Sequence, residues 1–288
     1  MSEIEKTSDK EDEKRETSTR WNQSRGARDA VPFADKRPML AKPAKDQNEK
    51  KAETPLKITN PYIIRFTEQD GHLTEEYRKL KSVILMMMRK NENQNTLLVA
   101  SSESGEGKSL TAVNLALVLA QESNRTVLLV DADLRRPTLH TYLGVKPDLG
   151  LADCLIDGFD LQAALIKTTV PRLSFLAAGK KTDTPAELLS SDRMKELMQE
   201  IKNRYHDRFI ILDTPPSLIF SDMRVLSPFA DGIIFVVKEG VAGDSVRDAL
   251  ASLKGSPLLG IVYNDASQEQ LNGRYHRYYK RQPYGNQT

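Results

Sequence analysis

Five short, continuous apolar runs rich in β-branched residues alternate with segments long enough for helices. Strands that are apolar on both faces, rather than alternating, are typical of a parallel sheet covered by helices on both sides. The sequence therefore predicts an α/β fold, doubly wound, with a mostly parallel sheet and functional loops at the carboxyl ends of its strands. We expect the five strands, and a sixth in the segment RLSFLAA, at residues 96–100, 126–130, 209–213, 232–237, 258–263 and 172–178.

Charge divides the chain into three parts. Residues 1–57 hold 14 Lys/Arg and 12 Asp/Glu, and residues 271–288 hold four Lys/Arg and no acid, which leaves 24 basic and 28 acidic residues in 58–270. The first part has four prolines and few aliphatic side chains, so it buries too little apolar surface to offset its ordering entropy. We predict a disordered leader (1–57), a folded domain (58–270) and a flexible tail (271–288).

The same composition excludes several classes of protein. The single cysteine, Cys154, cannot form an intramolecular disulfide, and Cys/His spacings typical of zinc sites are absent. The longest apolar run, Val83 to Met88, is far shorter than the roughly 20 residues of a spanning helix. With no signal peptide encoded, we expect a cytoplasmic chain. The apolar spacing in residues 74–90 predicts a helix that Thr74 caps.

A phosphate loop is expected after the first strand. TLLVA leads into SSESGEGKS and then into a helical pattern, the strand, glycine loop and helix order of a phosphate cradle. Gly105 and Gly107 allow backbone N–H groups to point inward, Lys108 can reach the β and γ phosphates, and the Ser109 hydroxyl can ligate Mg²⁺. The first glycine of the usual pattern is replaced by Ser102.

Acidic residues end two other predicted strands. Asp131 and Asp133 follow the second strand in VLLVDADLRRP, and Asp213 ends FIILD. In a parallel sheet both places open onto the edge where the phosphates would lie. We expect Asp213 to hold Mg²⁺ through water, Asp131 to approach the metal or accept a proton, and Asp133 to orient its neighbours. Arg135 and Arg136 follow closely, and they either neutralise phosphate charge or pair with Asp133.

These three motifs and the tyrosine-rich tail resemble the bacterial tyrosine kinases of capsule and exopolysaccharide systems, in particular the cytoplasmic autokinases of exopolysaccharide/exosortase loci. The resemblance spans roughly Leu73 to Tyr284, and its Walker A, Walker A′ and Walker B motifs match residues 101–109, 127–133 and 209–213. It implies an ATP- and Mg²⁺-dependent autokinase that phosphorylates its own C-terminal tyrosines, mainly between subunits of a ring. The acceptors would be Tyr275, Tyr278, Tyr279 and Tyr284.

The resemblance also implies further binding residues. A Glu-x-x-Arg-x-x-Arg element used for subunit contacts corresponds to Glu75, Arg78 and Lys81, with lysine in place of the last arginine. Asn264 matches a position that contacts the adenine ring in related proteins, although it could simply cap a loop. The residues expected to contact the nucleotide are Gly105, Glu106, Gly107, Lys108, Ser109, Leu110 and Asn264.

The resembling kinases act beside a membrane protein of the chain-length or copolymerase type. Because the leader is short and polar, we expect that partner to be a separate polypeptide that recruits this chain to the inner face of the cytoplasmic membrane, and we expect a cognate tyrosine phosphatase. Nucleic acid is a less favoured partner for the tail, although arginines interleaved with aromatics suit it.

The main alternative is a partition or cell-division ATPase. Those proteins begin the loop Lys-Gly-Gly, whereas Glu103 stands here. A nucleotide-binding subunit that transfers no phosphate is a further alternative.

Overall fold

The computed structural model describes residues 53–67, 71–88, 94–123, 125–204, 207–218 and 222–267. The predicted tail, with its four tyrosines, lies outside the described residues, and so does the predicted leader up to residue 52. Residues 53–57 of that leader are described, and they contact the domain.

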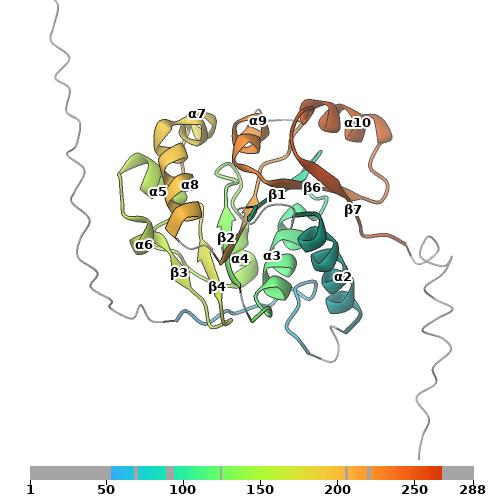
Figure 1. Cartoon of the computed structure of the whole chain (residues 1–288), viewed down its shortest axis with the longest axis horizontal. Coiled ribbons are helices and arrows are strands. Elements are labelled where there is room, and N and C mark those ends of the chain that lie inside the picture. Colours follow the sequence, from blue (N-terminus) through green and yellow to red (C-terminus); the bar gives the residue numbers. More distant parts are fainter. Residues whose placement is uncertain are drawn as a thin grey trace, which may run out of the picture. The chain divides into compact units, whose positions relative to one another are not determined.

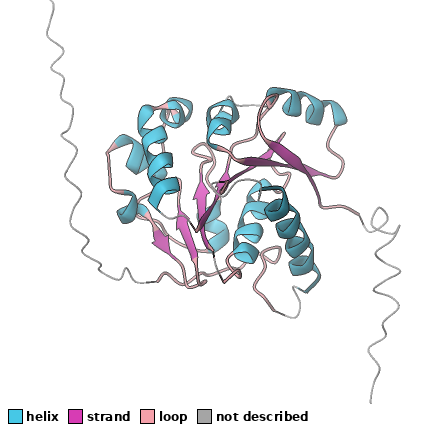
Figure 2. Ribbon diagram, viewed as in Figure 1, coloured by secondary structure: helices cyan, strands magenta, loops and turns pink. Residues whose placement is uncertain are grey.

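The domain is built on a seven-stranded sheet in the order β3-β4-β2-β5-β1-β6-β7 (Figures 1 and 2). All neighbouring strands are parallel except β3 and β4. The strands are β1 (Thr96–Ser101), β2 (Thr126–Asp131), β3 (Ile166–Lys167), β4 (Leu173–Leu176), β5 (Arg208–Asp213), β6 (Gly232–Lys238) and β7 (Leu258–Asn264).

The predicted doubly wound α/β fold is confirmed, together with all six predicted strands. The central strands β1 and β5 are buried along their whole length, which is why their sequences are continuously apolar. The two-residue edge strand β3 was not predicted, because Ile166–Lys167 is too short for any periodicity and its pairing with β4 depends on tertiary contact.

Helices cover both faces of the sheet (Figure 1). One face packs against α2 (Gly71–Met88), α3 (Lys108–Leu119) and α4 (Leu139–Leu143). The other packs against α5 (Leu151–Ile156), α6 (Leu161–Ala164), α7 (Pro185–Ser190), α8 (Asp192–Arg204), α9 (Asp222–Leu226), the 3-10 helix Ser227–Phe229 and α10 (Gly243–Ser252). Among the described residues, no helix is both long and apolar enough to cross a membrane.

Helix α2 begins three residues before the predicted start. Thr74 was expected to cap it, but Thr74 lies inside the helix and is buried. Leu73 packs against the apolar cluster beneath α2, and this contact favours helix on the N-terminal side of Thr74. The predicted end, residues 89–90, lies outside the described residues.

The segment before α2 is tied to the rest of the domain by backbone contacts. The Thr54 N–H donates to the Lys167 carbonyl at 2.7 Å, and the Lys57 N–H donates to the Leu143 carbonyl at 3.0 Å. Asn114, buried on α3, accepts the Ile64 N–H at 2.9 Å and donates to the Tyr62 carbonyl at 2.8 Å. This segment therefore contacts the same helix that carries the phosphate loop at its start.

Candidate active site

The phosphate loop joins β1 to α3 and has the backbone that its glycines were expected to supply. Gly105 and Gly107 have φ angles of 87° and 91°, a region that other residues enter only with strain. Gly107 is the N-cap of α3, and its carbonyl accepts the Thr111 N–H at 2.8 Å. The loop thus ends at the positive end of a 12-residue buried helix, a favourable position for phosphate.

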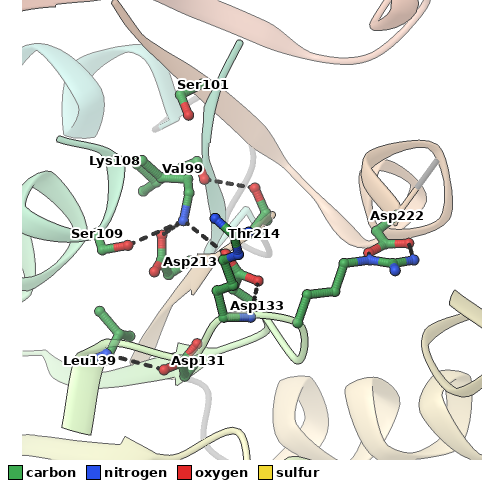
Figure 3. A network of polar contacts seen from close by, with 12 residues as sticks. Val99, Ser101, Lys108, Ser109, Asp131, Asp133, Leu139, Asp213, Thr214 and Asp222 are labelled. Carbon is green, nitrogen blue, oxygen red and sulfur yellow. Dashed lines mark hydrogen bonds and ion pairs between the residues drawn. The ribbon is translucent and has the colours of Figure 1, made fainter. Parts of the chain in front are cut away.

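Lys108 points from the start of α3 into a cluster of acids (Figure 3). Its Nζ lies 3.0 Å from Asp213 Oδ1, 3.5 Å from Asp133 Oδ2 and 3.1 Å from the Ser109 hydroxyl. Burial lowers the pKa of Lys108, but the charges of Asp213 and Asp133 outweigh it, and the pKa is raised. The lysine is therefore charged, and its counterions are the acids of the neighbouring strands.

Asp131 and Asp213 lie side by side at the carboxyl ends of β2 and β5. They are paired in register, and the Ala132 N–H donates to the Asp213 carbonyl at 2.9 Å. Both are fully buried, and burial raises the pKa of each carboxyl group. The charge of Asp213 raises the pKa of Asp131 further, whereas Lys108 and the Ser109 hydroxyl oppose the rise at Asp213.

Each of these two carboxylates keeps one oxygen without a hydrogen-bond partner in the described structure, Oδ1 of Asp131 and Oδ2 of Asp213. Buried polar atoms of this kind require an explanation, and an ion or a ligand is a common one. No group of three or more His, Cys, Asp or Glu side chains converges on a metal position within the described residues. A magnesium ion bound with phosphates needs only one or two carboxylates, so the donor set fits that ion.

Asp133 and Arg135 each contact a residue outside the ion pair that was expected between them. Asp133 Oδ1 accepts the backbone N–H of Arg136 at 3.0 Å. The Arg135 guanidinium donates to buried Asp222, with Nε and Nη2 at 2.7 and 3.1 Å from its two oxygens (Figure 3). This bidentate pair joins the turn after β2 to α9. No sequence pattern indicates this pair, because Asp222 belongs to no motif and lies 87 residues away.

Asn264 ends β7 and lies against the phosphate loop. Its Nδ2 donates to the Glu106 carbonyl at 2.9 Å, so the structure places it where it caps the loop. Contact with adenine stays a prediction. Leu110, also predicted to contact nucleotide, is half-buried on α3 and packs against the core beside that helix.

Glu106 has a structural role that sequence reasoning missed. Its side chain is buried and turned back into the loop, where Oε1 accepts the Glu103 N–H at 2.5 Å and the Ser102 hydroxyl. Ser102 replaces the first glycine of the usual pattern, and its hydroxyl donates a hydrogen bond to Glu106 within the loop.

The proposed subunit-contact residues lie on α2. Arg78 is exposed and Glu75 is half-buried, with 3.6 Å between Nη1 and Oε2, while Lys81 pairs with Glu122 of its own chain. The charge of Lys81 is thus engaged within the domain. A role for Glu75 and Arg78 between subunits stays a prediction.

A strand, a glycine loop with its lysine, and acids at the ends of two adjoining parallel strands define a P-loop nucleotide-binding protein. The family described as an AAA domain matches residues 94–251, more than half of the chain. The tyrosine-protein kinase YwqD of Bacillus subtilis is 36% identical over 206 residues, covering 70% of this chain and 85% of YwqD. The chain belongs to the bacterial tyrosine-protein kinases.

Solved structures agree with this family. The kinase domain of the Escherichia coli tyrosine kinase ETK is 29% identical, with a TM-score of 0.62, over 67% of this chain and 77% of that one. The septum site-determining protein MinD from Pyrococcus horikoshii is 23% identical, with a TM-score of 0.52, over 61% of this chain and 72% of that one. At that identity, MinD shows a shared fold only.

Gly107→Ala is expected to weaken nucleotide binding more than Gly105→Ala. Both place a Cβ at positive φ, which costs roughly 1–2 kcal/mol. At Gly107, however, that Cβ would lie 2.0 Å from the Asn264 side chain, while nothing lies within 4 Å at Gly105. Titration with a fluorescent ATP analogue should show the greater loss for Gly107→Ala. Equal losses would mean that the Asn264 contact has no part in shaping the loop.

Proposed function

We propose that this chain uses Mg·ATP to phosphorylate the tyrosines of its own C-terminal tail, mainly between neighbouring subunits of a ring. The observation that carries the proposal is the pairing of Asp131 and Asp213 in register, each with a free buried oxygen, beside Lys108. That arrangement can hold a metal-bound triphosphate and receive a proton at the same edge of the sheet.

Each residue then has a distinct part. Lys108 binds the β and γ phosphates, which compete with its present acidic partners, and the Ser109 hydroxyl and Asp213 hold the magnesium ion. ATP supplies the phosphoryl group. Asp131 accepts the phenol proton as the tyrosine oxygen bonds to the γ phosphorus and the bond to the departing ADP breaks. Burial raises the pKa of Asp131, and a higher pKa makes its carboxylate a stronger base.

The biological setting follows from the resemblance. We propose that the kinase regulates polymerisation or export of a capsule or exopolysaccharide, at the inner face of the cytoplasmic membrane beside a separate copolymerase-type membrane protein. A cognate tyrosine phosphatase would reset it. Purification of the tagged chain from solubilised membranes tests the recruitment, and recovery without any membrane protein would contradict it.

The four tail tyrosines allow a direct test of the proposed acceptors. Replacing Tyr275, Tyr278, Tyr279 and Tyr284 with phenylalanine should remove nearly all phosphotyrosine after incubation with Mg·ATP, because it removes the acceptor hydroxyls and leaves the nucleotide site intact. Phosphorylation adds about −1.5 to −2 charges at each tyrosine, enough to reverse the +4 of the tail. Mass spectrometry should locate the phosphates.

The matched control replaces two exposed tyrosines of the domain, Tyr62 and Tyr263, with phenylalanine. This variant should keep its phosphotyrosine signal. Phosphate found only outside the tail would contradict the acceptor assignment, and ATP turnover without any phosphotyrosine would favour the partition-type ATPase.

A further inference from the structure

Glu103 presents a free carboxylate from a fixed position on the phosphate loop. Its carbonyl accepts the Ser101 hydroxyl at 2.9 Å, and its N–H donates to Glu106 at 2.5 Å, so its backbone is held on both sides. The residue is exposed, and within the described residues its carboxylate has no hydrogen bond or ion pair.

The other acids at the carboxyl ends of the strands are buried, so they cannot pair with the cations of a substrate as Glu103 can. Asp131, Asp133 and Asp213 are buried around Lys108, and Glu106 is turned into the loop. Glu103 is therefore the acid of the phosphate loop that faces solvent. An exposed carboxylate beside a triphosphate site weakens ATP binding by repulsion, so its presence there calls for a compensating interaction.

Three of the four proposed acceptor tyrosines have a neighbouring cation, whereas Tyr284 lies between Pro283 and Gly285. Tyr275 and Tyr278 each follow an arginine, Tyr279 precedes Lys280, and residues 271–288 contain no acid. A residue beside the acceptor lies about 3.8 Å along the chain. The strand β1, which leads to Glu103, is two strands away from β2, which ends at the proposed base Asp131, a separation of about 9.6 Å at about 4.8 Å per strand. The long side chain of a flanking arginine or lysine would span the rest of the distance from a tyrosine at the catalytic centre to the loop.

We propose that Glu103 is a specificity residue that selects tyrosines flanked by arginine or lysine, through an ion pair with the flanking cation. This inference rests on the proposed function. It also gives a physical reason for an acid at the position where partition-type ATPases carry a lysine, since a lysine would repel the basic tail.

The test is transfer between two full-length chains. The donor has phenylalanine at the four tail positions, so it is not an acceptor there, and carries either Glu103 or Glu103→Gln. The acceptor carries Lys108→Arg, which is expected to remove its own activity, and has either the native tail or one with Arg274, Arg277, Lys280 and Arg281 changed to glutamine. Initial rates of tail phosphorylation are measured below saturation with acceptor.

Glu103→Gln should slow transfer to the native tail about two- to fivefold, the size of an exposed ion pair, and should leave transfer to the glutamine tail unchanged. The same variant should have a lower KM for ATP, because the repulsion is gone. A structural defect in the loop would instead raise the KM for ATP and slow both acceptors equally. The preference for the native tail should vanish at about 1 M salt, where the Debye length is about 3 Å.

The matched control is Glu200→Gln, a half-buried acid near the end of α8 that pairs with Arg204. Its rates should equal those of the parent donor. An unchanged rate for Glu103→Gln, or an equal loss on both tails, would overturn the inference alone. No tail phosphorylation by the parent pair would contradict the proposed function and this inference with it.

Discussion

Lys108→Met is expected to abolish phosphotyrosine formation, with a loss of at least about 100- to 1000-fold, the usual effect of removing one preorganised charge-stabilising group. Methionine cannot neutralise the charge that develops on the transferred phosphoryl group. It also leaves Asp213 and Asp133 without the cation that lies 3.0 and 3.5 Å away. Breaking a buried ion pair costs about 3–5 kcal/mol, so a lower melting temperature is expected too.

A second variant separates lost chemistry from lost stability. Lys108→Arg keeps a positive charge beside the acids and should stay folded. A planar guanidinium does not replace a compact ammonium at a phosphate, so phosphotyrosine should still be lost. The control is Lys180→Met, a lysine that pairs with Asp157 on the surface and should keep full activity. A folded, fully active Lys108→Arg protein would contradict the role given to Lys108.

Asp131→Asn is expected to remove activity while stabilising the nucleotide-free protein at neutral pH. Losing the proposed base should lower the rate about 10²- to 10⁴-fold. Asparagine can still accept the Leu139 N–H that Asp131 Oδ2 now accepts at 3.1 Å, and it carries no charge that burial must oppose. The melting temperature should therefore rise, and in a domain of this size each kcal/mol gained corresponds to roughly 2–4 °C.

The change in stability caused by Asp131→Asn should depend on pH, and the raised pKa of Asp131 sets the direction of that dependence. Burial, and then the charge of Asp213, raise the pKa of Asp131 well above its ordinary value of 3.8. The folded state therefore favours the protonated form. The stability that this group contributes is complete below its ordinary pKa and is lost as the pH rises through the raised pKa. The gain from Asp131→Asn should be small near pH 4 and should grow towards neutral pH in thermal melts.

Asp192→Asn is a control in which the pKa of the replaced carboxyl group is lowered rather than raised. A hydrogen bond from Lys195 lowers the pKa of exposed Asp192, so its contribution is present above the ordinary pKa and is lost as the pH falls. Asp192→Asn should therefore give no gain at neutral pH. A gain from Asp131→Asn that did not change between pH 4 and 8 would show that Asp131 does not titrate as its burial implies.

The sequence predicted the central strands because burial on both faces leaves a pattern that is local to each strand. It did not predict β3, which is two residues long, nor the start of α2, which depends on the packing of Leu73. It predicted the phosphate loop and the acids at the strand ends because a fixed order of strand, turn and helix places them at one edge of the sheet. Pairings between distant segments left no such pattern, as Arg135 and Asp222 show.

The sequence by itself therefore determined the fold class, the phosphate loop, the acids that accompany it and the charge of the tail. Only the tertiary structure decided which groups contact each other. It placed Lys108 against Asp213 and Asp133, turned Glu106 inward and left Glu103 facing solvent, although these two glutamates lie three residues apart in one loop. Hydrogen bonding and burial depend on neighbours that folding brings together, and a residue's identity does not specify them.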